Sequence, residues 1–208
     1  MRGGESTKKS TEPAILRPTR GRGLLEAPLA RLRAARADRL IRNELRAGRI
    51  LDIGCGSRPY FLSHTYFAEK FAVDQVISVP DVDVDWLQLD LNSGRHLPFE
   101  DGFFAVVTML AVVEHLDPET LVLLLCDIHR IVRPGGQLIL TTPASWSSCF
   151  LHVMAAAGLV SGEEIREHRY AYGVPLLKRY LSLAGFAVTR ARFGHFELGA
   201  NTWAVAER

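Results

Sequence analysis

The residues best suited to chemistry in this sequence stand at one short glycine turn, Asp52-Ile53-Gly54-Cys55-Gly56. Two glycines one residue apart let the backbone approach a ligand closely, because neither has a Cβ atom in the way. An acidic residue, Asp74, follows Gly54 by twenty positions, which suits a carboxylate that binds the two ribose hydroxyls of an adenosine-type cofactor. The pattern therefore predicts a cofactor site, although Gly-x-Gly alone occurs in many turns.

Two classes of cofactor use this layout, and two residues near the turn separate them. A nicotinamide dinucleotide typically requires a third glycine at the position that Pro59 occupies here. Asp52 stands directly before the turn, where it would repel a doubly negative pyrophosphate. S-adenosylmethionine is cationic at its sulfonium and amino groups, so the sign of the charge favours it over NAD.

A metal site is the weaker interpretation of the remaining acids and thiols. Asp81, Asp83 and Asp85 alternate with valines, a pattern more typical of a strand edge with solvated acids than of a metal site. The three cysteines, Cys55, Cys126 and Cys149, lie too far apart for zinc-ligand spacing. We therefore expect no metal.

An open α/β sheet would bring these scattered residues to one edge. Short apolar segments predict strands over residues 49–53, 70–73, 86–91, 104–110, 137–142, 186–193 and 202–206. Helical patterns predict helices over residues 24–47, 59–68 and 174–184, and another that starts at Asp117-Pro118 and ends at Pro134-Gly135-Gly136. This alternation predicts a Rossmann-like sheet of about seven strands, mostly parallel with an antiparallel C-terminal strand, and helices on both faces. Ligands bind such sheets at the carboxyl ends of the strands.

The first helix should bury one broad apolar stripe before Gly48 stops it. The leucines that would form this stripe are Leu25, Leu29, Leu32, Leu40 and Leu45.

Several segments in the right order resemble class I S-adenosylmethionine-dependent methyltransferases, in their small-molecule (type 11-like) branch. Ile50–Gly56 resembles the first motif of that family, and Phe104–Leu116 resembles the fourth-strand motif. The other matching segments are Asp90-Leu91 with Leu97-Pro98-Phe99, Ile131–Gly136, and Gly185-Phe186. The resemblance covers roughly residues 45–206, and the matches are specific together rather than singly. One departure is Ala105, where the family usually has an acid, which leaves open a locally altered fourth strand.

The resemblance implies cofactor contacts at matching positions. Gly54, Cys55 and Gly56 would present backbone to the methionine part, and Asp52 would sit beside it. Asp74 would bind the ribose hydroxyls. The remaining contacts would be Asp90 to the adenine amino group, the backbone of Leu91 beside it, and the carbonyl of Leu110 near the methionine amine.

The catalytic base, if one is needed, is not identified by this pattern. Weak candidates are His115, His168, Tyr172 and His195. For Glu114 and His115, packing and a hydrogen bond that orders the loop is the favoured interpretation. Methyl transfer from a sulfonium needs mainly alignment and a dry pocket, so a missing dyad does not count against an enzyme.

Charge is distributed unevenly along the chain. Residues 1–49 contain 13 Lys/Arg and 5 Asp/Glu, whereas residues 50–208 contain 12 and 18. We expect a flexible basic arm over residues 1–22 and a single methyltransferase domain, with its N-terminal helix, over residues 23–208. No segment predicts a membrane span or a signal peptide, so we expect a cytoplasmic enzyme.

The favoured function is methylation of a small molecule or of a glycan or lipid precursor. Two alternatives stay open. One is RNA methylation that uses the basic N-terminus, and the other is a non-catalytic protein that binds S-adenosylmethionine. Neither the acceptor nor the oligomeric state follows from the sequence.

Overall fold

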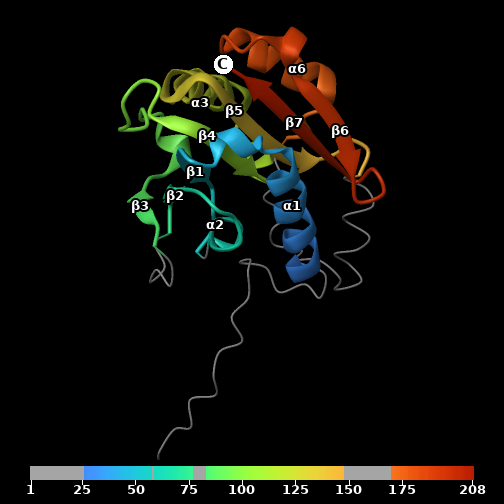
Figure 1. The fold of residues 1–208 in the computed structure, drawn as a ribbon. Helices are drawn as coiled ribbons and strands as arrows, with labels where there is room; N and C mark the ends of the chain where they lie inside the picture. The colour runs from blue at the N-terminus through green and yellow to red at the C-terminus, as the bar shows by residue number, and fades with distance from the viewer. Residues whose placement is uncertain (1–25, 58, 77–82, 148–169) are drawn as a thin grey trace, which may run out of the picture.

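The computed structural model describes residues 26–57, 59–76, 83–147 and 170–208. Its described residues form a seven-stranded sheet in the order β3-β2-β1-β4-β5-β7-β6 (Figure 1). The strands are β1 (Arg49–Ile53), β2 (Glu69–Asp74), β3 (Asp85–Gln88), β4 (Phe104–Leu110), β5 (Val132–Pro143), β6 (Arg192–Phe196) and β7 (Asn201–Glu207). Strands β1 to β5 run parallel to one another, and β7 runs antiparallel to both β5 and β6. The predicted Rossmann-like fold class is confirmed.

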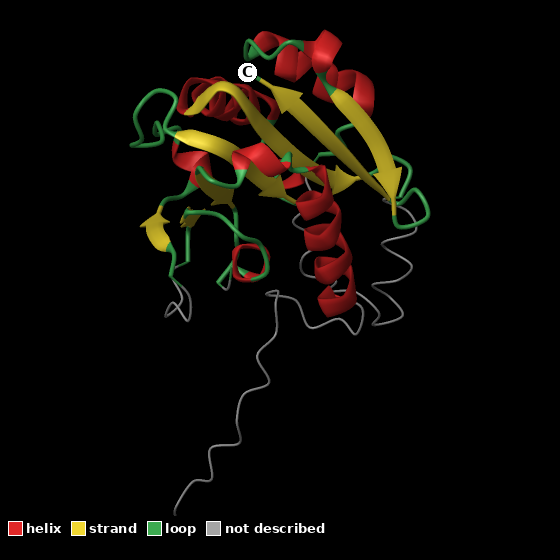
Figure 2. Ribbon diagram, in the orientation of Figure 1, coloured by secondary structure: helices red, strands yellow, loops and turns green. Residues whose placement is uncertain are grey.

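Helices cover both faces of this sheet (Figure 2). They are α1 (Glu26–Leu40), α2 (Tyr60–Ser63), α3 (Pro118–Ile131) and α6 (Val174–Leu183). Asp117 caps α3 as predicted, since its Oδ1 accepts hydrogen bonds of 3.0 Å from the N–H groups of Glu119 and Thr120. The predicted arm over residues 1–22, His168 and Asp81 lie outside the described residues.

Successive residues of each strand alternate between two hydrophobic cores, because strand side chains point to opposite faces. One core lies under α3 and α6 and contains Leu51, Ile53, Val107, Met109, Leu138 and Leu140. The other lies under α1 and α2 and contains Ile50, Ala72, Val106, Ile139 and Val205. The central strands are therefore buried on both sides, and their carboxyl ends form the natural place for a ligand.

The first helix differs from the prediction in both its end and its buried face. α1 ends at Leu40 rather than at Gly48, because the N–H of Arg42 donates 3.0 Å to Oε1 of Gln137 on β5 instead of continuing the helix. A 3₁₀ turn, Asn43–Leu45, follows. The buried face is made by small residues such as Ala34 and Ala37, whereas Leu32 of the predicted stripe is 54% exposed.

The segment Pro134-Gly135-Gly136 does not end a helix, as was predicted, but lies inside β5. α3 ends at Ile131, and β5 starts at Val132. The pairing of β5 with β4 is irregular here, since Phe104 pairs with Val132 and Val106 with Gln137. The departure at Ala105 thus coincides with a locally altered fourth strand.

Three further predicted elements were too long. The third strand stops at Gln88 because Asp90 begins the short 3₁₀ helix Leu91–Ser93, and the helix predicted over residues 59–68 is the single turn α2. The strand predicted over residues 186–193 starts only at Arg192. The N–H of Phe186 donates 3.0 Å to the carbonyl of Leu181 and completes the end of α6, where Gly185 has a φ of 96°.

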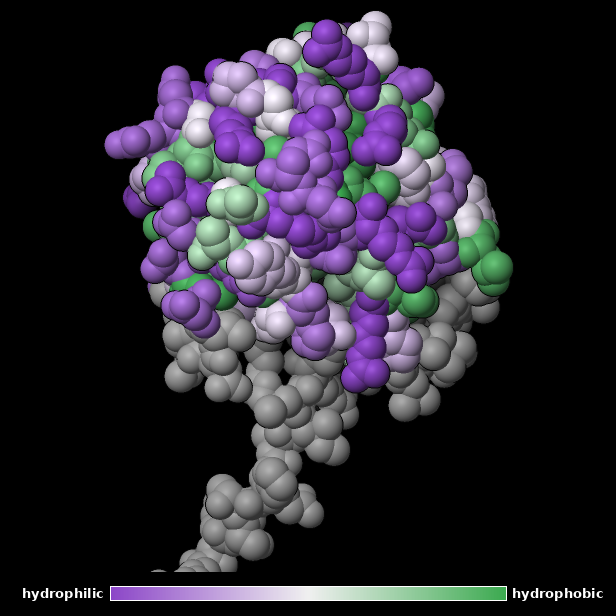
Figure 3. Space-filling model, in the orientation of Figure 1, coloured by the Kyte–Doolittle hydropathy of each residue, from purple (hydrophilic) through white to green (hydrophobic). Residues whose placement is uncertain are grey.

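The helices of the described residues can be compared with the length and hydropathy that a membrane-spanning helix needs. Every helix in the described part is too short or too polar to span a membrane. On the face seen in Figure 3, hydrophilic side chains predominate and apolar residues occur only in small groups.

Candidate functional site

The glycine turn directly follows β1, and its two glycines serve different purposes. Gly54 has a φ of 72°, and a Cβ atom there would lie 2.4 Å from Cγ2 of Val112, so packing alone requires a glycine. Gly56 has a φ of 73°, but a Cβ atom there would meet nothing within 4 Å. The space beside the backbone of Gly56 is therefore open to a ligand.

Asp74 ties the glycine turn to the end of the neighbouring strand β2. Its Oδ2 accepts a 2.8 Å hydrogen bond from the N–H of Gly56, and its Oδ1 accepts a 3.0 Å bond from the N–H of Val76. The residue is only 7% exposed. The carboxylate is thus held at the sheet edge, next to the turn, by two backbone donors.

Asp52 is the last polar residue of β1 and is buried beside the turn. The hydroxyl of Thr108 on β4 donates a 2.6 Å hydrogen bond to Oδ1 of Asp52. Burial raises the pKa of Asp52 to about 7; the Thr108 bond opposes that shift, and the negative charge of Asp74 adds to it. A cation bound nearby would favour the ionised form.

The other predicted cofactor residues lie along the same edge. Asp90 follows β3 and is exposed, with its Oδ1 accepting a 2.9 Å hydrogen bond from the N–H of Asn92. Leu91, Leu110 and Cys55 are half-buried at the ends of β3, β4 and β1. The structure therefore brings the predicted residues to the carboxyl ends of four adjacent strands.

The catalytic candidates are not brought together. Tyr172 is 1% exposed, and its hydroxyl donates a 2.7 Å hydrogen bond to the carbonyl of Leu116. Burial also raises the pKa of this phenol, so its geometry suits packing rather than proton abstraction. His195 lies on the edge strand β6, where Nδ1 is 3.2 Å from the hydroxyl of Thr202. His115 is half-buried in the loop after β4. Because β4 is adjacent to β1, His115 is the described candidate nearest to the glycine turn in the strand order.

A second polar group, which the sequence analysis did not assign to a site, lies further along the sheet edge. Glu114 is 1% exposed, yet neither oxygen of its carboxylate has a hydrogen-bond partner. The loop is nevertheless ordered by a 3.3 Å hydrogen bond from the N–H of Tyr170 to the backbone carbonyl of Glu114. Burial raises the pKa of Glu114, while His115, Arg33 and the hydroxyl of Thr142 act in the opposite direction. Burial likewise raises the pKa of Glu197, on the β6–β7 turn, and the positive charge of Arg33 opposes that shift.

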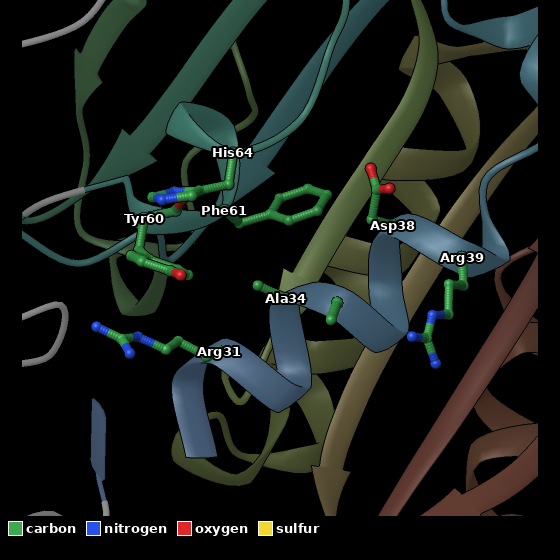
Figure 4. Close-up of a pocket in the computed structure, with 8 residues that line it drawn as sticks. Arg31, Ala34, Asp38, Arg39, Tyr60, Phe61 and His64 are labelled. Carbon is green, nitrogen blue, oxygen red and sulfur yellow. The ribbon is translucent and has the colours of Figure 1, made fainter. Parts of the chain in front are cut away.

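The described residues also form a depression between α1 and α2 (Figure 4). Its volume is about 240 Å³, and its lining includes Arg31, Asp38 and the stacked rings of Tyr60 and His64. None of the predicted cofactor residues lines it. Asp38 is already paired with Arg46 and Thr65, so the depression does not replace the sheet edge as the candidate site.

Metal ligands do not gather anywhere in the described part of the chain. No group of three or more His, Cys, Asp or Glu side chains there has the arrangement needed to hold a metal ion. Of the three alternating acids, Asp83 is exposed in a bend and Asp85 is exposed at the start of β3.

Known proteins resemble this chain both in sequence and in fold. The profile of a family described as methyltransferase domain matches residues 24–191. The ubiquinone biosynthesis O-methyltransferase of Maricaulis maris is 32% identical over 124 residues, which are 55% of this chain and 48% of that protein. The chain thus spans about half the length of this relative.

Two solved structures illustrate the likeness in fold. A SAM-dependent methyltransferase from Archaeoglobus fulgidus has a TM-score of 0.63 at 17% identity, covering 86% of this chain and 94% of that one. Phosphoethanolamine N-methyltransferase 2 of Haemonchus contortus, in complex with S-adenosyl-L-methionine, has a TM-score of 0.60 at 12% identity, covering 85% and 52%. At these identities the likeness establishes the fold.

Proposed function

The chain belongs to the methyltransferase-domain family, as a class I, S-adenosylmethionine-dependent member, and from that premise we propose that it methylates a small molecule or a glycan or lipid precursor. One observation supports this most directly. Two buried carboxylates, Asp52 and Asp74, flank a glycine turn that leaves open space beside Gly56. Buried acids suit a cationic cofactor and oppose a pyrophosphate.

The residues at this edge fit S-adenosylmethionine in both charge and shape. The backbone of Gly54, Cys55 and Gly56 and the carbonyl of Leu110 would surround its methionine part. Asp74 would hold the ribose hydroxyls, and Asp90 with Leu91 would meet the adenine. Asp52 would complement the nearby positive charge. Its pKa is near 7, so a bound cation, which lowers that pKa, would shift the carboxyl to its ionised form.

When bound, the cofactor supplies an electrophilic methyl group for in-line displacement. The protein must then align the acceptor and exclude water. Val112, packed against the glycine turn, joins the loop after β4 to the cofactor edge, so this loop is placed to do both. An acidic hydroxyl needs only positioning, whereas an alcohol needs a base, for which His115 lies nearest in the strand order.

A small acceptor is favoured by the nature of the relatives. The Maricaulis maris protein is named for O-methylation in ubiquinone biosynthesis, and the Haemonchus contortus protein for N-methylation of phosphoethanolamine. Both names describe methylation of small molecules, on oxygen in one case and on nitrogen in the other. The atom that this chain methylates is therefore a question for experiment.

Three of the seven arginines of residues 26–49 are paired with acids of the same molecule and give the RNA alternative no support. Arg46 pairs with Asp38, Arg49 pairs with Glu69, and Arg42 pairs with Glu44 and Glu207. These side chains are engaged within the molecule rather than presented together as a phosphate-binding surface.

Two measurements test the proposed function. S-adenosylmethionine and S-adenosylhomocysteine should raise the melting temperature, NAD should not, and Asp74→Ala and Gly54→Val should abolish the shift. Incubation with methyl-labelled S-adenosylmethionine should then label small molecules of a cell extract rather than its RNA. Labelling of RNA that weakens steeply with salt would instead favour the RNA alternative, and binding without any labelling would favour a non-catalytic protein.

A further inference from the structure

Unpartnered buried atoms concentrate at one place in the described part of the chain. Eight buried side-chain nitrogen and oxygen atoms there lack a hydrogen-bond partner. Five of the eight belong to only four residues: Arg33 Nε, Glu114 Oε1 and Oε2, Thr142 Oγ1, and Glu197 Oε1. Buried polar groups are normally satisfied, so a local concentration of exceptions indicates a site for a polar ligand.

The fold brings these four residues together from distant parts of the sequence. Arg33 lies on α1, Glu114 in the loop after β4, Thr142 near the end of β5, and Glu197 on the turn between β6 and β7. α1 packs against both β4 and β5. The pairing of Thr142 with Thr202, and of Phe196 with Asn201, sets the β6–β7 turn beside the end of β5.

Electrostatics link the two carboxylates into one site. The positive charge of Arg33 acts on both Glu114 and Glu197, and Thr142 acts on Glu114. The site lies next along the sheet edge from the glycine turn, because β4 stands between β1 and β5. An acceptor beside a cofactor at the glycine turn would lie along this edge of the sheet.

The chain holds Glu197 in place at a conformational cost. Glu197 and Leu198 have φ values of 51° and 55°, a left-handed conformation that costs a non-glycine residue about 1–2 kcal/mol. The tight turn is closed by hydrogen bonds from Gly199 to the Phe196 carbonyl and from Ala200 to the Glu197 carbonyl, both 3.0 Å. The other oxygen of the Glu197 carboxylate accepts a hydrogen bond from Asn201, which leaves Oε1 without a partner.

The unsatisfied hydrogen-bond donors and acceptors decide what kind of group would fit. Three of the five unpartnered atoms are carboxylate oxygens, which accept hydrogen bonds, whereas Arg33 Nε can only donate. A neutral hydroxyl would satisfy some of these hydrogen-bonding atoms. It would leave the negative charge of the two carboxylates to be balanced mainly by Arg33. A protonated amino group provides three donors and a compensating charge.

We propose that Arg33, Glu114, Thr142 and Glu197 form the acceptor-binding subsite, and that this subsite takes the protonated amino group of a small amine. This assignment rests on the proposed methyltransferase function. The amino group serves here as the recognised anchor, and the methylated atom can be the same group after deprotonation or another part of the molecule.

Matched pairs of compounds test this assignment. The probes are ethanolamine against ethylene glycol, glucosamine against glucose, and tyramine against 4-(2-hydroxyethyl)phenol. Each is titrated by calorimetry into the full-length protein, with and without S-adenosylhomocysteine. At least one amine should bind at least about tenfold more tightly than its hydroxyl counterpart.

Variants of the two carboxylates should remove that preference. Glu114→Gln and Glu197→Gln should each weaken amine binding by about tenfold or more while leaving the Kd for S-adenosylhomocysteine within about twofold. Glu100→Gln, a change at an exposed glutamate outside the subsite, should alter neither. Equal binding of amine and hydroxyl partners, unchanged amine binding in Glu114→Gln, or no binding by any amine would overturn the assignment.

The proposed function and the amine subsite can be rejected separately by these measurements. If the unmodified protein does not bind S-adenosylhomocysteine but does bind an amine, the proposed function is rejected and the amine subsite is supported.

A measurement without ligand adds a further check. Glu114→Met, which replaces an unpartnered buried carboxyl by an apolar side chain of similar length, should raise the melting temperature by about 2–4 °C. A fall in the melting temperature would mean that Glu114 stabilises the fold and would count against a ligand site.

Discussion

Asp52 on β1 and Thr108 on β4 are paired directly across the two central strands, and the Thr108 hydroxyl donates 2.6 Å to Oδ1 of Asp52. This hydrogen bond satisfies one oxygen of a carboxyl that is only 3% exposed. The pair stands immediately before the glycine turn. Titration of Asp52 is therefore linked both to the stability of the sheet and to the charge of whatever binds at its edge.

The raised pKa of Asp52 predicts a pH-dependent stability. In the unfolded chain the carboxyl loses its proton near the ordinary value of 3.8, whereas in the fold it keeps the proton to about 7. Between these values the folded state binds more protons, so the contribution of Asp52 to the free energy of unfolding falls as pH rises from about 4 to about 7 and levels off above that. Urea unfolding at several pH values measures this.

Asp52→Asn is the matched variant for that experiment, since the amide oxygen can still accept from Thr108. The part of the pH slope that belongs to Asp52 should disappear in this variant. The affinity for S-adenosylmethionine should rise with pH toward 7 in the unmodified protein, because a bound cation favours the ionised carboxylate. A slope and an affinity profile that both persist in Asp52→Asn would contradict this origin.

Asp74→Asn should damage both the fold and cofactor binding. Both carboxylate oxygens accept backbone N–H groups, from Gly56 and Val76, and an amide can accept only through one of them. We expect a loss of about 1–3 kcal/mol in the free energy of unfolding and at least about tenfold weaker binding of S-adenosylhomocysteine. Asp83→Asn, at an exposed bend, is the control and should change neither quantity. Unaltered cofactor binding in Asp74→Asn would refute the ribose-binding role.

The sequence predicted the strands and the glycine turn of this sheet edge well because the signals there are local. A short apolar strand, two glycines and an acid at the next strand end all lie within residues 49–74. Each feature is fixed by the backbone conformation or by burial of its own segment. That is why strand β4 was predicted with its correct bounds, Phe104–Leu110, and why Asp117 was recognised as a cap.

The errors and omissions arise where distant contacts override local pattern. The end of α1 depends on Gln137, which is 95 residues away from Arg42. Leucine spacing suggested a stripe, but close packing against the sheet selects Ala34 and Ala37. The influence of the Arg33 charge on Glu114 and Glu197 depends on the strand order, and no spacing in the sequence signals it. Clusters of this kind become visible only in three dimensions.

Tyr172→Phe should lower stability without impairing catalysis. The change removes the 2.7 Å hydrogen bond to the carbonyl of Leu116 in a site that is 1% exposed, which should cost about 1–2 kcal/mol. Binding of S-adenosylhomocysteine and the rate of methyl transfer at 20 °C should change by less than about twofold. If the rate instead drops by more than about tenfold while the melting temperature stays constant, Tyr172 contacts the reacting atoms and our packing assignment is wrong.

The two glycines of the turn should respond differently to the same substitution. Gly54→Ala places a Cβ atom 2.4 Å from Cγ2 of Val112, so the fold should be destabilised by clash as well as by backbone strain. Adding Val112→Ala should relieve the clash and restore part of the lost stability.

In Gly56→Ala the new Cβ atom meets no atom within 4 Å, so the variant should cost only the strain of its positive φ, about 1–2 kcal/mol. The Cβ atom of that variant nevertheless enters the space assigned to the cofactor, so S-adenosylhomocysteine should bind at least about tenfold more weakly. Thermal unfolding and calorimetry on the three variants separate the two effects, and full cofactor affinity in Gly56→Ala would show that the open space beside this glycine is not where the cofactor lies.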